Sequence, residues 1–524
     1  MDQITPEALK SLLLGSAEFA LIDVREQGVF SEAHLLFAVC IPLSQLELSV
    51  GDLVPRRETP IVLVDESDDA QADVIAAARL AQFGYSDVRR LAGGIAGWRA
   101  AGFELFSGVN VPSKAFGEFV ETTYDTPRLP ADEVKALLDA GEDMVIVDSR
   151  PYEEFHRMSI PSGVDMPGAE LVYRIHDHAP NPDTLVVVNC AGRTRSIIGA
   201  QSLINAGIPN RVVALKDGTM GWHLAGHELA HGETEEAAAP SEAGLAAARA
   251  AAARVAERFG VRTASAATVR AWREEADRTT YLLDVRSPGE YADSHRRGFR
   301  NAPGGQLVQA TDEYVAVKNA RLVLADDVGV RATMTASWLI QMGWTDVWVA
   351  DPDDPAEVEQ GVPTPTVLGV VGDASISTAA LEAALERSLV IDLGPSTRFA
   401  QRHIPGAVWC PRARLAQALD LLEGQAQVVL TSPDGLLARL ALAEARSLTE
   451  IDVHALEGGT DRWLAEARTT EAGIDRAVGE TNDVWYKPYE HRAAQEKFMR
   501  DYLTWEVALV EQLERDGTTQ FRTF

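Results

Sequence analysis

Short apolar segments of four or five residues recur along the chain and alternate with longer segments rich in Ala and Leu. The short segments are rich in Val, Ile and Leu and predict buried strands, while the longer ones carry apolar residues at helical spacing. The clearest case is residues 185–206, LVVVNCAGRTRSIIGAQSLINA, in which a strand leads through a polar loop into a helix. Strands that alternate with helices predict parallel sheets with helices on both faces.

This pattern occurs four times, which indicates tandem modules. In each copy a first strand ends on an aspartate, a turn closed by proline follows, and a second apolar strand precedes a helix. In three copies an arginine stands two residues after the aspartate, and three copies end with a Gly-Gly or Asp-Gly turn and a tryptophan. The aspartates are Asp23, Asp148, Asp284 and Asp392, and the tryptophans, which we expect in the core, are Trp98, Trp222 and Trp463.

The repeat therefore predicts an α/β protein of four tandem domains, each a central parallel sheet with helices on both faces, and a helical C-terminal tail. We place the domains at residues 1–106, 128–232, 258–356 and 373–470, and the tail at 476–524.

Two segments outside the modules have a helical pattern. Residues 233–256 are rich in Ala, Glu and Arg and predict a helical spacer, because alanine has the highest helix propensity. In the tail, Tyr502, Trp505 and Leu509 form part of an apolar face. We expect this face to pack either on the body of the protein or on a second copy, as a homodimer.

Composition restricts the partners and the compartment. The net charge of −30 argues against binding to nucleic acid or to an anionic membrane surface. The three cysteines are too few for a disulfide framework and indicate a reducing compartment. We find neither a signal peptide nor an apolar run of the ~20 residues that a membrane span needs, and we expect a cytoplasmic protein.

Cys190 is the strongest candidate for chemistry. It lies between the end of a strand and the start of a helix, where unpaired N–H groups and the helix dipole favour an anion. Arg193 and Arg195 add two positive charges. We therefore expect a depressed pKa and a nucleophilic thiolate at Cys190. We also expect Gly192 to adopt a positive φ and to let a ligand approach closely.

The other modules have no thiol at this position. An alignment on the helix that follows the second strand places Ser67, Asp326 and Ser432 opposite Cys190. A serine without a histidine base is a poor nucleophile, and an aspartate repels an anionic donor. We interpret the first, third and fourth modules as catalytically silent.

The Asp-x-Arg after the first strand, the proline-closed turn, the loop Cys-Ala-Gly-Arg-Thr-Arg and the Gly-x-x-Gly-Trp ending resemble the rhodanese family of sulfurtransferases. The resemblance implies that Cys190 takes a sulfane sulfur as a persulfide and passes it to cyanide or a thiol, with no cofactor. Thiosulfate is the favoured donor, since it is a small dianion that needs positive charge and N–H donors. The residues implied to bind it are Ala191, Gly192, Arg193, Thr194, Arg195 and Arg150.

Three alternatives accompany this hypothesis. Phosphatases of the Cdc25 type and arsenate reductases share the fold, but their loop is Cys-x5-Arg, whereas Cys190 to Arg195 is one residue shorter. The protein could instead be a scaffold or sulfur relay, in which Cys190 receives sulfur from a partner protein. Arg150 could form a structural ion pair with Asp148 rather than bind the donor, because this pair recurs in modules without a thiol.

Histidines cluster at the end of the second module, at His223, His227 and His231. No thiol or carboxylate accompanies them at a spacing typical of metal ligands. We interpret them as a solvated helix face and expect no metal site.

Overall fold

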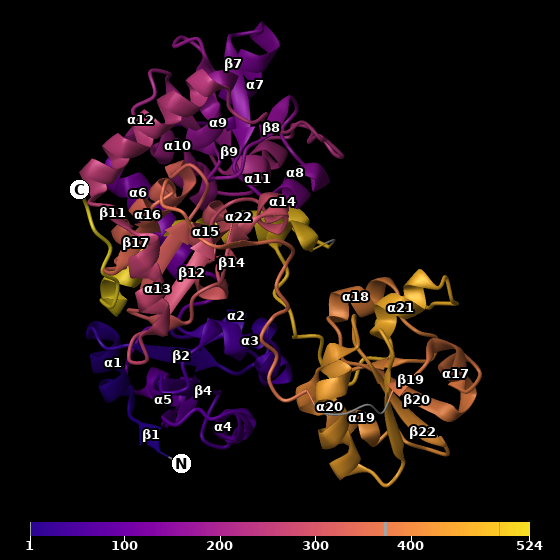
Figure 1. Ribbon diagram of the computed structural model, residues 1–524. Coiled ribbons are helices and arrows are strands. Elements are labelled where there is room, and N and C mark those ends of the chain that lie inside the picture. The colour runs from indigo at the N-terminus through magenta and orange to yellow at the C-terminus, as the bar shows by residue number, and fades with distance from the viewer. Residues whose placement is uncertain (1, 371–374, 492) are drawn as a thin grey trace. The chain divides into compact units, whose positions relative to one another are not determined.

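A computed structural model describes residues 2–370, 375–491 and 493–524 (Figure 1). The predicted starts of the first module at residue 1 and of the fourth at residue 373 lie outside these residues. The chain forms two compact units, and Cys190 belongs to the unit that holds the second and third modules. One unit consists of Met1–Leu9, Phe19–Val109 and Thr364–Tyr486, and the other of Lys10–Glu18, Asn110–Pro363 and Lys487–Phe524.

Each of the two modules in the second unit has a parallel sheet of five strands, in which the first strand of the module is followed by its fifth, fourth, second and third. In this order the strands are β6 (Arg128–Leu129), β10 (Val212–Leu215), β9 (Leu185–Asn189), β7 (Met144–Asp148) and β8 (Gly163–Asp165) in the second module, and β11 (Arg262–Ala264), β17 (Val347–Ala350), β16 (Arg321–Ala325), β12 (Thr280–Asp284) and β14 (Arg300–Asn301) in the third.

The modules of the first unit repeat this order, which confirms the predicted fold class of four modules with central parallel sheets. Their strands are β1 (Gln3–Ile4), β5 (Val88–Leu91), β4 (Ile61–Val64), β2 (Phe19–Asp23) and β3 (Val39–Cys40), and β19 (Ser375–Ile376), β23 (Asp452–Leu456), β22 (Gln427–Thr431), β20 (Ser388–Asp392) and β21 (Val408–Trp409). Three short strands lie outside these orders: β13 (His295–Arg296), β15 (Val317–Lys318) and β18 (Val358–Glu359).

The helices follow the strands as the sequence pattern predicts, except that the third module lacks a helix after its fifth strand, where the Gly-x-x-Gly-Trp ending is also missing. In the second unit the helices are α6 (Val111–Tyr124), α7 (Ala131–Ala140), α8 (Tyr152–Arg157), α9 (Leu171–His178), α10 (Thr194–Ala206), α11 (Gly218–Leu224), α12 (Glu242–Phe259), α13 (Ala266–Glu274), α14 (Pro288–Asp293), α15 (Gly304–Gln309), α16 (Val330–Gln341) and α22 (Gln495–Asp516). The others are α1 (Pro6–Leu14), α2 (Gln27–Glu32), α3 (Leu46–Leu53), α4 (Ala72–Gln82), α5 (Gly94–Ala100), α17 (Thr378–Glu382), α18 (Ser396–Gln401), α19 (Leu415–Leu419), α20 (Leu436–Leu448) and α21 (Gly459–Ala465).

Strand β9 is buried on both faces, as expected of a strand inside a parallel sheet. Val186 and Val188 point into a cluster with α9, α10 and α12, while Val187 joins a second cluster that contains Trp222. Helix α12 confirms a helix in the predicted segment 233–256, although it begins only at Glu242 and continues to Phe259. It is more than a spacer, because its alanines and Val255 lie in the same cluster as α9 and α16.

The pairing register between the second and fourth strands of each module corrects one expectation. Asp148 pairs with Asn189, so Cys190 is the next residue, and the equivalent registers place Asp326 and Ser432 after β16 and β22. In the first module Asp23 pairs with Val64, so the residue at the thiol position is Asp65 and not Ser67. The alignment on the helix was wrong there because this loop is longer than in the other copies.

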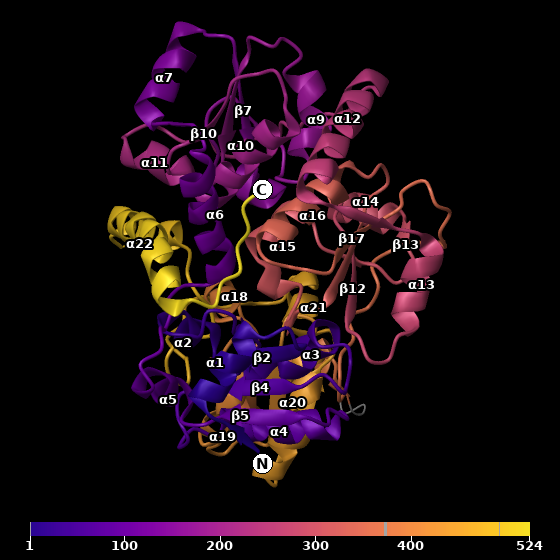
Figure 2. The same ribbon diagram turned by 90° about the vertical axis from the view of Figure 1, so that its left-hand side faces the viewer.

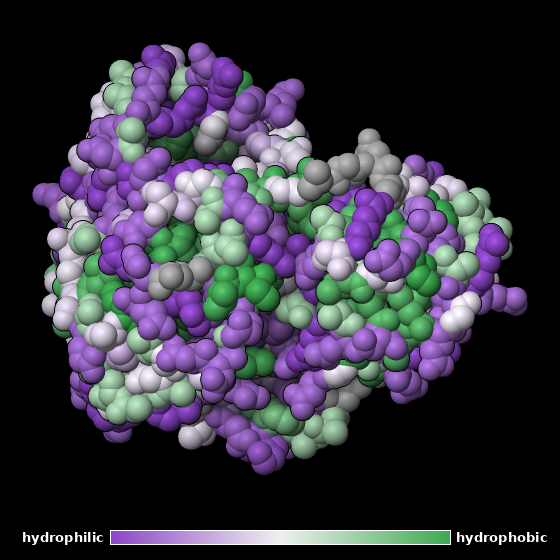
Figure 3. Space-filling model, turned by 90° about the horizontal axis from the view of Figure 1, so that it is seen from below, coloured by the Kyte–Doolittle hydropathy of each residue, from purple (hydrophilic) through white to green (hydrophobic). Residues whose placement is uncertain are grey.

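The surface combines hydrophilic and hydrophobic areas. Hydrophilic residues cover much of the face shown in Figure 3, with hydrophobic areas between them. Among the residues that the structure describes, no helix is long and apolar enough to cross a membrane.

The tryptophan of the Gly-x-x-Gly-Trp ending is a core residue in all three copies, as predicted, since Trp98, Trp222 and Trp463 are fully buried. Trp222→Ala should lower the free energy of unfolding by about 3–5 kcal/mol, because it leaves a large cavity. Denaturant unfolding followed by circular dichroism measures this. His223→Ala, on the same helix but half-buried, is the matched control and should cost less than about 1 kcal/mol. Equal costs for the two variants would contradict the assignment.

Candidate active site

Cys190 follows the carboxyl end of β9 and precedes α10, at the edge of the sheet where ligands bind in open α/β folds. Its thiol donates a hydrogen bond to Ser196 Oγ at 3.5 Å, and the backbone N–H groups of Gly192 and Ser196 interact with its sulfur. The loop thus forms the amide cradle that the sequence predicts at this junction.

The predicted depressed pKa of Cys190 is wrong for this arrangement. The residue is 2% exposed, and burial raises the pKa of its thiol. The charge of Arg195 and the hydrogen bonds from Ser196 and Gly192 lower the pKa by less. Burial prevails because the thiol has lost the water that would solvate a thiolate.

Arg195 is the loop cation that acts on the thiol. Its guanidinium pairs with Glu154 of α8 at 2.9 Å and donates to Gln306 Oε1 at 3.3 Å. Although burial raises the pKa of Glu154, Arg195 and then Lys487 lower it to about 2. The Glu154 carboxylate therefore holds Arg195 in place.

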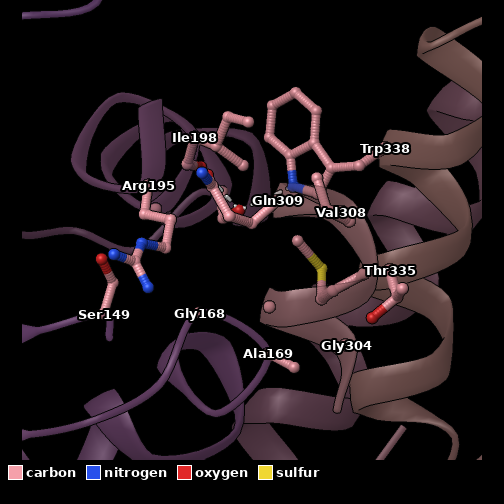
Figure 4. A pocket seen from close by; sticks show the side chains of 14 residues that line it. Ser149, Gly168, Ala169, Arg195, Ile198, Gly304, Val308, Gln309, Thr335 and Trp338 are labelled. Carbon is pink, nitrogen blue, oxygen red and sulfur yellow. Dashed lines mark hydrogen bonds between the residues drawn. The ribbon is translucent and has the colours of Figure 1, made fainter. Parts of the chain in front are cut away.

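A small cavity of about 30 Å³ lies beside Arg195. Figure 4 shows the Arg195 guanidinium near Ser149, with Gln309 and Trp338 on other walls. The cavity has room for one or two water molecules. Cys190 is not among the residues that line it.

Arg193 does not act on the thiol as the sequence suggested. It donates to Glu118 through two nitrogens at 2.7 Å, to Glu121 at 2.5 Å and to Asp217 at 3.1 Å. Three carboxylates neutralise one guanidinium. Arg193 therefore fastens the loop to α6 and α11.

Arg150 forms the structural ion pair that was one of its two predicted roles. Its side chain is fully buried and donates to both oxygens of Asp148, at 2.8 and 2.7 Å, and to the carbonyl of Met158 at 2.6 Å. Asp148 also accepts from the side chain of Asn189, the residue before Cys190. In the described residues, Nη1 of Arg150 has no hydrogen-bond partner.

The Asp-Gly turn before α11 holds the Cys190 loop through backbone hydrogen bonds. Thr219 N donates to Cys190 O at 2.8 Å, and Met220 N donates to Ala191 O at 3.0 Å. Gly218 has a φ of +57°, and a Cβ there would collide with Cys190 O. This contact explains the glycine of the terminal motif in the second module.

Gly192 does not have the expected positive φ, which 24 glycines within residues 2–370, 375–491 and 493–524 do have. It does allow the expected close approach. A Cβ on Gly192 would stand 2.8 Å from Met220 Cε, 3.3 Å from Glu506 Oε2 and 3.6 Å from Tyr502 Cε1. The neighbours that need a glycine here are thus protein side chains, two of them from the tail.

The C-terminal tail covers the loop. Helix α22 packs against α6 (Figure 2), and Tyr489 and Met499 form an apolar cluster with Ala191 and Met220. Thr194 Oγ1 donates to Glu506 Oε1 at 3.3 Å. Of the two alternatives predicted for the apolar face of the tail, packing on the body is the one observed. The homodimer remains a prediction, but the apolar face of the tail no longer supports it.

In two of the modules without a thiol at this position, a carboxylate stands where the thiol would be. Asp326 accepts from the backbone N–H groups of Gly329 and Arg331 at 2.8 and 3.0 Å, and burial raises its pKa to about 6. Asp65 accepts from Glu66 N and Asp73 N at 2.8 and 3.2 Å. In these two modules an aspartate side chain thus binds backbone N–H groups at the strand–helix junction, as the Cys190 sulfur does in the second module.

The third module keeps one of the two loop arginines. Arg331 stands at the position of Arg195 and pairs with Glu290 of α14 at 2.9 Å, as Arg195 pairs with Glu154. The pair is therefore part of the module's frame and is not specific to the thiol.

Comparison with known proteins decides the family. A model of the rhodanese-like domain matches residues 5–101, 130–225, 265–351 and 377–466. The chain belongs to the rhodanese-like family. A crystal structure of a thiosulfate sulfurtransferase from Pseudomonas aeruginosa is 48% identical with a TM-score of 0.95, and the match covers 100% of both chains. These findings confirm the predicted family and the predicted class of enzyme, a rhodanese-type sulfurtransferase.

Two further solved structures match the chain with low TM-scores. The wild-type structure of EanB is 17% identical with a TM-score of 0.25, over 69% of this chain and 98% of that chain. A rhodanese-related protein from Thermoplasma volcanium is 18% identical with a TM-score of 0.17, over 19% and 98%. TM-scores this low support no argument about fold or function. No curated protein matches the chain significantly.

Several residues at this rhodanese-like site were missed by the sequence interpretation. Glu118 lies in a connector between modules, and Tyr502 and Glu506 lie more than 300 residues after Cys190. No local pattern relates them to the loop. Glu154 had a usable signal, because an acidic residue recurs as Glu290 at the same distance from the strand aspartate.

Among the residues described, no three His, Cys, Asp or Glu side chains are grouped so that they could hold a metal ion. His227 instead contacts Asp132 at 2.9 Å, and His231 lies 2.7 Å from the carbonyl of Arg157.

The two loop arginines should differ in their effect on the thiol. Arg195→Gln removes the cation that lowers the pKa of Cys190, so iodoacetamide alkylation of Cys190 should shift to higher pH. Arg193→Gln should leave this pH profile almost unchanged. It should instead lower the free energy of unfolding by about 3–5 kcal/mol, because buried carboxylates lose their partner. Equal pH shifts in both variants would contradict this division of roles.

Gly192→Ala should loosen the tail, because Met220 and Glu506 have to move to accommodate the new methyl group. We expect faster amide hydrogen exchange in α22 and several-fold faster alkylation of Cys190. Gly289→Ala is the matched control, since a Cβ there meets only open space. If α22 exchanges at the wild-type rate in Gly192→Ala, the tail contact does not depend on this glycine.

Proposed function

We propose that this sulfurtransferase carries sulfane sulfur as a persulfide on Cys190 and that thiosulfate is a donor. The observation that carries the proposal is the contact of the Cys190 sulfur with the N–H groups of Gly192 and Ser196. Cys190 is also the one cysteine that directly follows the fourth strand of a module. The full-length similarity to a thiosulfate sulfurtransferase from Pseudomonas aeruginosa supports the choice of donor.

The first half-reaction needs a thiolate and a bound dianion. The Cys190 thiolate attacks the outer sulfur of thiosulfate, the S–S bond breaks, and sulfite leaves with the electron pair. The product is an anionic persulfide. The loop amides of Ala191 to Ser196 and the charge of Arg195 stabilise it in the same way as they stabilise the thiolate.

Arg150 is a candidate for binding the sulfonate end of the donor. Its Nη1 is buried and has no hydrogen-bond partner in the described residues. In the first module the equivalent Arg25 makes the same bonds to its aspartate, and its Nη1 pairs at 2.8 Å with Glu66, the residue after the thiol position. We infer that the anion of the donor takes the place in the second module that the Glu66 carboxylate takes in the first.

The second half-reaction regenerates the enzyme. A nucleophilic acceptor, either cyanide or a thiol, attacks the outer sulfur of the persulfide, and Cys190 leaves as the thiolate. Since Cys190 is 2% exposed, the tail has to move before donor or acceptor reaches it. We propose that the tail opens and closes during each turnover.

The remaining modules are proposed to be silent. In the first and third modules Asp65 and Asp326 occupy the amide cradle, and an anionic donor would be repelled there. In the fourth module Ser432 Oγ accepts from Ala438 N at 3.3 Å, and a serine without a base is not a nucleophile. We also propose a cytoplasmic location, because none of the three cysteines, all of which the structure describes, forms a disulfide.

Cys190→Ser should abolish formation of thiocyanate from thiosulfate and cyanide. Mass spectrometry after treatment with thiosulfate should find one added sulfur on Cys190 of the wild type and none on the variant. Cys40→Ala is the matched control and should retain full activity. If the wild type takes up no sulfur from thiosulfate but does so from a persulfidated protein, the sulfur-relay alternative replaces the proposal.

A further inference from the structure

Helix α22 brings a buried carboxyl group to the Cys190 loop that the proposed chemistry has not used. Glu506 is 2% exposed. Its Oε1 accepts from Thr194 Oγ1 at 3.3 Å and from the Tyr502 hydroxyl at 3.0 Å, while Oε2 has no hydrogen-bond partner in the described residues. A buried polar atom without a partner destabilises the fold, so its presence needs an explanation.

The unpartnered oxygen faces the sulfur-binding loop. It lies 3.3 Å from the point where a Cβ on Gly192 would stand, and the Tyr502 ring lies 3.6 Å from the same point. The backbone N–H of Gly192 is one of the two that interact with the Cys190 sulfur. An acceptor that reached the persulfide would therefore approach it next to this carboxyl group.

The groups around Glu506 allow both of its protonation states near neutral pH. Burial raises the pKa of Glu506 to about 7. Lys114 of α6, the hydrogen bond from Tyr502 and the charge of Arg193 lower this pKa, and Glu118 of α6 raises it. A group with a pKa near the working pH can both accept and return a proton.

The two half-reactions differ in their need for such a group. Transfer from thiosulfate to the Cys190 thiolate moves no proton. A thiol acceptor has a pKa of about 8.5 and is mostly protonated at neutral pH, so its proton must be removed before it attacks.

We propose that Glu506 is the proton carrier of the acceptor half-reaction and that the natural acceptor is a small thiol. This inference rests on the proposed persulfide on Cys190. The Glu506 carboxylate takes the proton of the acceptor thiol, and the resulting thiolate attacks the outer sulfur of the persulfide. The bond between that sulfur and Cys190 breaks, the electron pair stays on Cys190, and Glu506 returns its proton to the outer sulfur of the new persulfide.

The test separates the two half-reactions. The full-length enzyme is loaded with thiosulfate, the sulfur on Cys190 is counted by mass spectrometry, and its discharge by cysteine is followed after rapid mixing. Glu506→Gln should load as the wild type does and discharge to cysteine about 100-fold more slowly. Discharge to sulfite dianion, which has no proton to give up, should be unchanged.

Glu514→Gln is the matched control, an exposed glutamate on the same helix. It should load and discharge as the wild type does. Failure of the wild type to load would refute the persulfide itself. Normal loading together with wild-type discharge of Glu506→Gln to cysteine would overturn only the role of Glu506.

A second variant distinguishes proton transfer from loss of the tail contact. Tyr502→Phe removes a hydrogen bond that lowers the pKa of Glu506, so the pH at which discharge to cysteine reaches half its maximum should rise. A merely structural contact would change the rate without moving this pH. An unmoved pH profile in Tyr502→Phe would therefore also overturn the proposal.

Discussion

The aspartate at the end of β7, the second strand of the second module, holds the catalytic edge of that module together. Asp148 accepts two bonds from the Arg150 side chain and one from Asn189, which precedes Cys190. Arg150 in turn fixes the turn after α8 through the carbonyl of Met158. Since all these groups are buried, loss of one partner would leave an uncompensated charge, and this makes the arrangement rigid. This rigid arrangement fixes the positions of the loop amides and of the thiol.

A second constraint is the opposition between burial and charge at the thiol. The tail removes Cys190 from water and raises its pKa, while Arg195 and the loop amides lower it. The closed enzyme thus protects a thiol that would otherwise be open to oxidation. Opening of the tail would return water to the site and shift the balance toward the thiolate. Glu506 lies on the same segment, so closing of the tail both covers Cys190 and brings the proposed proton carrier to it.

The modules that lack the thiol show which groups the loop N–H groups and the strand arginine can bind. Asp326 places a carboxylate on the N–H groups at the start of α16, and Glu66 places one on Nη1 of Arg25. Each carboxylate satisfies groups that would otherwise be buried and unpaired. The second module has no such internal anion at Cys190, and its Arg150 Nη1 is left without a partner in the described residues. An external anion can therefore bind only where the chain does not supply its own.

The sequence by itself determined the four modules, their parallel sheets, the helix within 233–256 and the thiol at a strand–helix junction. These features depend on residues close together in the chain, whose spacing reports strand and helix periods. It also singled out Arg193 and Arg195, but their different roles depend on Glu118 and Glu154, which reach the loop from other elements. The assignment of Asp65 to the thiol position required the strand register, because the loop after Asp65 is longer than in the other modules. The cover of Cys190 by Tyr502 and Glu506 was decided only by tertiary structure, since packing across more than 300 residues leaves no periodic trace in a single sequence. The raised pKa of the thiol follows from that cover, and for this reason local charge alone predicted the wrong direction.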